Sequence, residues 1–202
     1  MPHYFSPDAD ATASRATKKR VTLRTEPFTV TTDRGVFSGE KVDPGTKVLL
    51  ELVPDPAGAG TAVDVGCGWG PITMALASAL PEARVIGVDV NPRAVELTRE
   101  NLARNGLAGE AHLVEDLLGA EPDLTCDLIW SNPPIRVGKS VLHDIMRTWL
   151  PRLSPGGVAY LVVNKNLGGD SLHKWIEREL GFEVERVGSR QGFRVLAVTP
   201  TS

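Results

Sequence analysis

The sequence predicts an α/β protein with a mostly parallel sheet that is covered by helices on both faces. From residue 61 onward, apolar segments rich in Val, Ile and Leu alternate regularly with helical segments. The apolar segments are nearly continuous, which is typical of strands buried on both sides. The last two are joined by GSRQG, which is too short for a crossover helix, so we expect them to pair antiparallel.

The expected elements follow from these patterns. Asn91 is expected to cap a helix that has Pro92 at its first position. The expected strands are 61–66, 83–90, 111–116, 126–132, 156–164, 182–187 and 193–199. The expected helices are 43–52, 71–80, 92–106, 141–153 and 171–180. Residues 1–47 are turn-rich, with short β-like pieces (VTL and FTVTT) around the turn DRG, and we expect a small β-rich extension packed on a main domain at 48–202.

Composition limits the class of protein. The chain has 202 residues, 42% of them hydrophobic and 23% charged, which is typical of one compact globular domain. No apolar run is long enough to span a membrane, and the start has no secretory signal, so we expect a cytoplasmic protein. A net charge of -3 does not indicate nucleic-acid binding by the chain as a whole. The run SRATKKRVTLR is either a local RNA-binding patch or a solvated segment.

The cysteines and histidines do not form a metal-binding pattern. Cys67 and Cys126 lie in or beside apolar strand-like segments, where we expect them to be small buried hydrophobic residues. The four histidines show no metal-ligand spacing with each other or with the cysteines. We therefore predict no metal.

The motif VDVGCGWG follows the first strand and opens the next helix. It places Asp64 before Gly66, Gly68 and Gly70, and these glycines allow a tight turn and a close approach of the backbone to a ligand. Asp89 ends the second strand, where its carboxylate is placed to accept hydrogen bonds from two ribose hydroxyls. Together these residues predict a cofactor that contains a nucleoside.

The details of this motif favour S-adenosylmethionine over NAD. Pro71 stands where a dinucleotide-binding motif has its third glycine. The carboxylate of Asp64 suits a cationic ammonium group and would repel a pyrophosphate. Asp116, at the end of the third expected strand, is placed to accept the adenine amino group, while Glu115 is expected to face solvent.

The segment SNPP ends the fourth expected strand, beside the first strand and the cofactor. Two prolines can neither extend a helix nor donate to a sheet ladder, so this segment is either a strand-ending turn or a catalytic motif. The side-chain carbonyl of Asn132 and the backbone carbonyl of Pro133 are suited to accept both N–H bonds of a planar amine. Pro134 would keep the backbone rigid. This geometry predicts methyl transfer to a planar amine or amide nitrogen.

The motifs VDVGCGWG, VDVN and SNPPI resemble the class I S-adenosylmethionine-dependent methyltransferases that have an NPP motif. The segments HYFS, DRGVFS and DPGTKVLLE are similar to the small-methyltransferase-domain family, which includes the bacterial 16S ribosomal RNA guanine-N2 methyltransferases. The resemblance implies a doubly wound, seven-stranded, Rossmann-like sheet of order 3-2-1-4-5-7-6.

The resemblance also implies roles for individual residues. It assigns Asp64, Gly66, Gly68 and Gly70 to the methionine part of the cofactor, Asp89 to the ribose, Asp116 to the adenine and Asn132 to the target amine. It implies that Phe37 closes over the cofactor, although Phe37 is equally suited to anchor the N-terminal segment in the core.

Two features depart from the family pattern. Ile135 follows NPP where members usually carry an aromatic residue or histidine that stacks on a flipped base. The larger members also contain a second, degenerate copy of the domain, which this chain lacks. Substrate capture is therefore expected from the basic run, from another subunit, or from Arg136, Lys139 and Lys165.

The leading hypothesis is methylation of the exocyclic N2 amine of guanine in ribosomal RNA, free or within the small ribosomal subunit. Adenine N6 and a glutamine amide of a protein are alternative acceptors for the same chemistry. An NAD-dependent oxidoreductase and a non-catalytic RNA-binding module are the alternatives from other classes of function.

Overall fold

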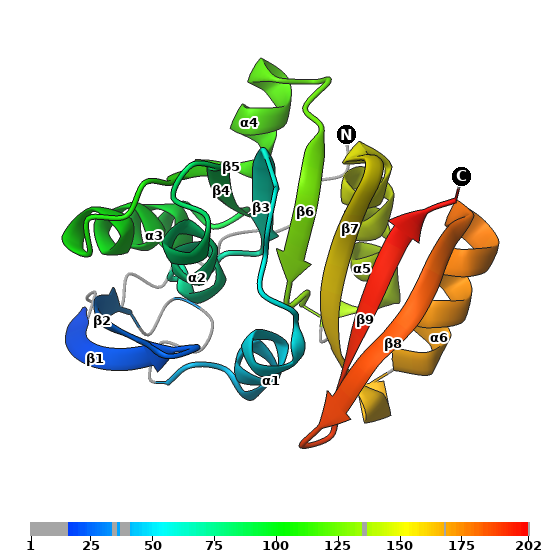
Figure 1. Cartoon of the computed structure of the whole chain (residues 1–202), viewed down its shortest axis with the longest axis horizontal. Helices are drawn as coiled ribbons and strands as arrows, with labels where there is room; N and C mark the ends of the chain where they lie inside the picture. The colour runs from blue at the N-terminus through cyan, green and yellow to red at the C-terminus, as the bar shows by residue number, and fades with distance from the viewer. Residues whose placement is uncertain (1–15, 34–35, 37–40, 135–136, 168, 202) are drawn as a thin grey trace.

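The structure is a computed structural model, and it describes residues 16–33, 36, 41–134, 137–167 and 169–201. Its helices and strands are β1 Thr17–Leu23, β2 Glu26–Thr32, α1 Pro44–Leu52, β3 Thr61–Val65, α2 Pro71–Ala79, β4 Arg84–Asp89, α3 Pro92–Arg104, β5 Glu110–Leu113, α4 Val114–Ala120, β6 Cys126–Ser131, α5 Lys139–Trp149, β7 Leu153–Asn164, α6 Gly169–Trp175, β8 Phe182–Arg190 and β9 Phe193–Pro200 (Figure 1).

The main sheet has seven strands in the order β5-β4-β3-β6-β7-β9-β8. Numbered from β3, this is the predicted order 3-2-1-4-5-7-6, and the prediction is confirmed. The pairs from β5 to β7 are parallel, whereas β9 is antiparallel to both β7 and β8. β3 is the topological switch point, because the chain moves outward from it in one direction and then returns to its other side with β6.

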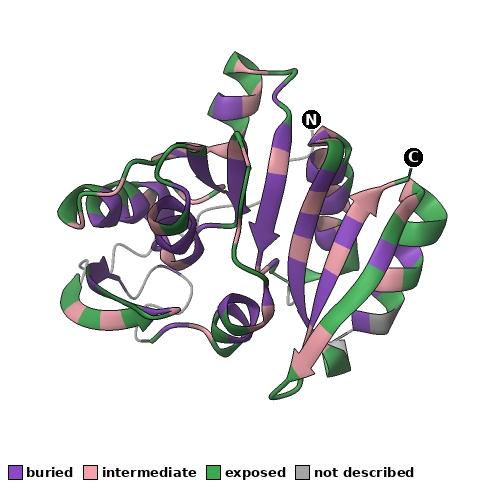
Figure 2. Ribbon diagram, viewed as in Figure 1, coloured by how far each residue is buried: buried purple, intermediate pink, exposed green. Residues whose placement is uncertain are grey.

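Alternation along the strands builds a core on each face of the sheet. On β3, Ala62 packs with the helices α1, α2 and α3, while Val63 and Val65 pack with α5 and α6 on the opposite face. The central strands β3 and β6 are mostly buried, as Figure 2 shows. Cys67 and Cys126 are buried and free, which confirms the expectation for both cysteines.

The N-terminal strands β1 and β2 form a separate antiparallel hairpin that packs on α3. Its turn lies at Arg24 and Thr25, and Arg24 has a positive φ of 55°. The turn expected at DRG follows β2, where the Val36 N–H donates to the Asp33 carbonyl at 3.2 Å. The reversal between β1 and β2 at Arg24 and Thr25 was not predicted from the sequence. The expected division between residues 47 and 48 falls within α1 and stays a prediction.

Two polar side chains of α3 hold this hairpin. Asn101, which is fully buried, accepts a hydrogen bond from the Thr31 N–H at 2.7 Å and donates to the Thr31 carbonyl at 2.9 Å. One turn later, Asn105 makes the same pair of bonds with Thr29, at 3.1 and 2.9 Å. A two-stranded hairpin is only marginally stable alone in water, so its packing and hydrogen bonds with α3 stabilise it.

Candidate active site

The turn between β3 and α2 carries the predicted glycines. The N–H groups of Gly66 and Cys67 both donate to the Val88 carbonyl, at 2.8 and 2.9 Å, which ties the turn to the end of β4. Gly70 caps α2 with a φ of 94°, and a Cβ there would lie 3.0 Å from Thr98 Oγ1. Glycine is required at this position by both the backbone conformation and the space.

Asp64 is fully buried beneath this turn. Its Oδ2 accepts hydrogen bonds from the Thr73 hydroxyl at 2.6 Å and from the Thr73 N–H at 2.9 Å, while its Oδ1 is buried without a hydrogen-bond partner among the described residues. Burial raises the pKa of Asp64 to about 7, and the charge of Asp89 adds to this, although the Thr73 hydrogen bonds act in the opposite direction. A buried carboxyl with an unsatisfied oxygen is prepared for a polar or cationic ligand.

Asp89 lies at the end of β4, next to the glycine turn. Its two carboxylate oxygens accept hydrogen bonds from the Gly68 N–H and from the Asn91 N–H, each at 2.9 Å. Each oxygen keeps a second lone pair, and the residue is partly exposed. The carboxylate is thus held in one orientation with acceptor capacity left over.

Asp116 lies on a different element from the one expected. β5 ends at Leu113, and Asp116 is an exposed residue in the first turn of the short helix α4. Leu113 pairs with Asp89 in the sheet, so α4 begins at the same edge as Asp89. A negative charge in the first turn stabilises a helix through its dipole. Asp116 therefore has a structural role at this position in addition to its expected contact with adenine.

Asn132 follows directly after β6, beside the glycine turn. The preceding Ser131 donates from its hydroxyl to the Val65 carbonyl at 2.6 Å, and this bond joins the ends of β6 and β3. The side-chain Nδ2 of Asn132 donates to Asp43 Oδ1 at 2.8 Å and to Thr46 Oγ1 at 3.1 Å. Sequence reasoning missed Asp43 and Thr46, although Asp-Pro at residues 43 and 44 is a signal for a helix cap.

The structure places the remaining predicted residues as follows. Pro133 is buried and Pro134 is exposed. Lys139 is the exposed first residue of α5, and Lys165 is exposed directly after β7. Phe37, Ile135 and Arg136 lie outside the described residues, so their expected roles stay predictions.

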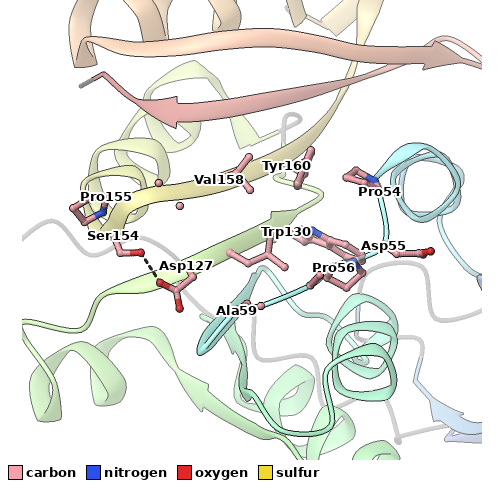
Figure 3. A pocket seen from close by; sticks show the side chains of 15 residues that line it. Pro54, Asp55, Pro56, Ala59, Asp127, Trp130, Ser154, Pro155, Val158 and Tyr160 are labelled. Carbon is pink, nitrogen blue, oxygen red and sulfur yellow. Dashed lines mark hydrogen bonds between the residues drawn. The ribbon is translucent and has the colours of Figure 1, made fainter.

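A pocket of about 390 Å³ lies apart from these residues. It is lined by the loop 54–59, by β6 and by the first part of β7, as Figure 3 shows, with Trp130 and Tyr160 on its wall. Its lining residues include none of the predicted cofactor or acceptor residues. We therefore assign the site from the chemistry of the side chains at the carboxyl ends of β3 to β6.

The part of the chain that the structure describes contains neither a metal centre nor a membrane-spanning helix. Within the described ranges, no group of three or more His, Cys, Asp or Glu residues is arranged to hold a metal ion. In that same part of the chain, no helix has both the length and the apolar character to cross a membrane.

The sheet order, the glycine turn and the acidic residues at the strand ends together define the Rossmann-like methyltransferase class. The family model of the methyltransferase small domain matches residues 27–197. The chain belongs to this family.

Three comparisons show what the chain is similar to. It is 36% identical over 195 residues to the uncharacterized protein YbxB of Bacillus subtilis, covering 96% of each chain. It is 33% identical over 198 residues to the ribosomal RNA small subunit methyltransferase C of Pseudomonas entomophila, covering 96% of this chain and 58% of that one. Its fold matches the T. thermophilus 16S rRNA N2 guanine methyltransferase in complex with AdoMet and guanosine, with a TM-score of 0.80, 27% identity and coverage of 92% of this chain and 51% of that one.

The chain therefore spans about half the length of the ribosomal RNA methyltransferases that it matches, and nearly the whole length of YbxB.

Proposed function

We propose that the protein methylates the exocyclic N2 amine of a guanine in ribosomal RNA. One observation carries the proposal: the Asn-Pro-Pro segment directly follows β6, and the Ser131–Val65 hydrogen bond fastens it beside the glycine turn. The acceptor-binding segment and the cofactor-binding segment thus meet at one edge of the sheet.

The cofactor is S-adenosylmethionine, and the residues of this edge fit it. Asp64 offers a buried oxygen without a partner for the methionine part, and Asp89 offers acceptor capacity for the ribose. A Cβ at Gly66 would meet nothing within 4 Å, so the turn borders open space. When bound, S-adenosylmethionine supplies an electrophilic methyl group carried on a positively charged sulfur.

Asn132 and Pro133 hold the acceptor. The lone pair of an exocyclic amine is delocalised into the ring, so the amine is a poor nucleophile until it is oriented. The Asn132 Oδ1 and the Pro133 carbonyl each accept one N–H bond of the amine, which directs its lone pair toward the methyl group. The two consecutive prolines limit the motion of these acceptors.

Two of the similar proteins support guanine in RNA as the acceptor. The Pseudomonas entomophila relative is named as a small-subunit ribosomal RNA methyltransferase, and the T. thermophilus structure contains guanosine. Exposed Lys139 and Lys165 flank the same edge and supply positive charge for RNA phosphates. The matched enzymes are about twice as long as the region that this chain covers. The residues that bind RNA in this chain are therefore proposed from its own surface.

The test uses methyl-labelled S-adenosylmethionine with four separate substrates: small ribosomal subunits, large ribosomal subunits, protein-free ribosomal RNA and a cell protein extract. Each sample is digested and the labelled product is identified. Label in N2-methylguanosine is expected, and it should be absent when Asn132→Ala replaces the wild-type protein. Label in N6-methyladenine or methylglutamine would overturn the guanine assignment while keeping the fold and the cofactor.

A further inference from the structure

We propose that Asp43 and Thr46 are positioning residues that orient the Asn132 amide for the acceptor amine. The inference rests on the proposed role of Asn132 and adds two residues from the start of α1, 89 and 86 positions away in the sequence.

Asp43 determines which end of the Asn132 amide faces it. An ionised carboxylate only accepts hydrogen bonds, so the Asn132 NH2 group must point toward Asp43. The bonds from Asn132 Nδ2 to Asp43 Oδ1 and to Thr46 Oγ1, at 2.8 and 3.1 Å, use both N–H groups of the amide. The Oδ1 of Asn132 then faces away from α1, and its two lone pairs remain for an N–H donor.

Asp43 is itself held by the start of α1. Its Oδ1 also accepts hydrogen bonds from the Gly45 N–H at 2.7 Å and from the Thr46 N–H at 3.2 Å, which makes it the N-cap of the helix. The buried residues Val48 and Leu49 anchor α1 in the core. Because α1 is anchored, Asp43 is held in place at its start, and Asp43 in turn holds the Asn132 amide.

Gly45 gives the contact its space. A Cβ at this position would lie 2.9 Å from Asp43 Oδ1, 3.0 Å from Phe193 Cε1 and 3.3 Å from Asn132 Nδ2. A side chain at Gly45 would thus push on both partners of the hydrogen bond. Each residue of the segment Asp-Pro-Gly-Thr thus has a part in this contact. Asp43 caps the helix, Pro44 begins it, Gly45 leaves space, and Thr46 supplies the second acceptor.

Without this arrangement, the Asn132 amide loses its preference between two orientations related by a half-turn. One orientation presents the carbonyl to the acceptor amine, and the other presents an NH2 group, which repels an N–H donor. Asp43→Ala and Thr46→Val should therefore lower kcat for methyl transfer by about tenfold or more, because each removes a hydrogen bond that fixes the amide. The dissociation constant for S-adenosylmethionine should change by less than about twofold, because neither residue lies among the proposed cofactor ligands.

The experiment compares Asp43→Ala, Asp43→Asn, Thr46→Val and Thr46→Ser. Asp43→Asn and Thr46→Ser keep an acceptor oxygen and the helix cap, so each should restore most of the activity that its partner variant loses. Thr46→Val keeps the side-chain shape, and it provides the test if Asp43→Ala does not fold.

A second readout does not depend on activity. In ¹⁵N spectra of the wild-type protein without ligands, the side-chain NH2 signals of Asn132, assigned by their loss in Asn132→Ala, should exchange slowly with solvent. They should exchange faster in Asp43→Ala and in Thr46→Val.

The outcomes separate this inference from the proposed function. Full methyl transfer by Asn132→Ala would overturn the proposed role of Asn132, and this inference with it. Loss of transfer in Asn132→Ala, together with wild-type kcat in Thr46→Val and in Asp43→Ala, would overturn only the positioning by α1.

Discussion

Asp89 accepts a hydrogen bond from the Gly68 N–H at 2.9 Å, so the proposed ribose ligand also holds the turn that faces the methionine part of the cofactor. Gly68 lies in the connection from β3 to α2 and Asp89 is the last residue of β4, so this bond fixes the glycine turn against the end of the neighbouring strand.

Asp89→Ala should weaken S-adenosylmethionine binding by about 1 to 3 kcal/mol, because it removes charge-assisted hydrogen bonds both to the ligand and to the turn. Asn132→Ala should leave this affinity within about a few-fold, since Asn132 is assigned to the acceptor. Isothermal titration of both variants measures the difference. Equal losses of affinity in the two variants would show that Asn132 is not an acceptor ligand.

The buried carboxyl of Asp64 should make the stability of the ligand-free protein depend on pH. Burial raises the folded-state pKa from 3.8 to about 7, so the neutral form is favoured in the folded protein. This contribution to stability is fully present below the unfolded pKa and is lost as the pH rises through about 7. Between pH 6 and pH 8, the free energy of unfolding should fall by about 1 kcal/mol from this group.

Asp64→Asn is the control for this pH dependence, because the amide keeps the shape and does not ionise. Urea denaturation of both proteins at the two pH values measures the effect. The difference between the two proteins isolates Asp64 from the histidines, and an identical pH dependence in both would contradict the assignment.

Asn101→Ala should destabilise the protein by about 2 to 4 kcal/mol, because it leaves buried groups without partners. These groups are the N–H and carbonyl of Thr31 and the carbonyl of Trp69, to which Asn101 donates at 2.8 Å. Asn105→Ala is the matched control, since Asn105 makes the same contacts with Thr29 in an exposed setting and should cost about 1 kcal/mol or less. Urea unfolding midpoints compare the two, and equal losses would refute the role of burial.

RNA affinity should become less sensitive to salt when the exposed lysines at the site are neutralised. Lys139→Gln and Lys165→Gln should each weaken RNA binding and lower the slope of log affinity against log salt by about 1 for each phosphate that no longer has a cationic partner. Arg178→Gln is the control, because Arg178 is exposed on the segment after α6, beside strand β8. Filter binding at several salt concentrations measures the slopes, and a similar change in Arg178→Gln would show that only net charge matters.

Local patterns in the sequence predicted much of the fold. The cap of α3 formed as expected, since Asn91 accepts from the Arg93 N–H and Pro92 is the first helical residue. The helix α4 was missed because Val114 extends the apolar end of β5 and two acidic residues then resemble a strand end, whereas strand pairing with β4 stops at Leu113. The hairpin turn was missed because Arg24 and Thr25 carry no Gly, Pro or Asn signal.

The site was predictable only where the chemistry is local. The glycines and acidic residues lie at fixed spacing from their strands, so their positions follow from the strand pattern. The contact between Asp43 and Asn132 joins residues 89 positions apart, and it depends on how α1 packs on β7 and β9. The unsatisfied oxygen of Asp64 likewise depends on burial, which no spacing rule contains.

The attachment of the hairpin to α3 has a consequence for the order of folding. Thr31 is joined to Asn101 across 70 positions, so the ribosome makes the hairpin strands well before their partner helix. During synthesis, β1 and β2 must remain without stable structure until α3 has emerged, because a lone hairpin is marginal in water. The carbonyl of Trp69 receives its hydrogen bond from Asn101 at the same stage. The hairpin and the glycine turn should therefore become protected from hydrogen exchange together.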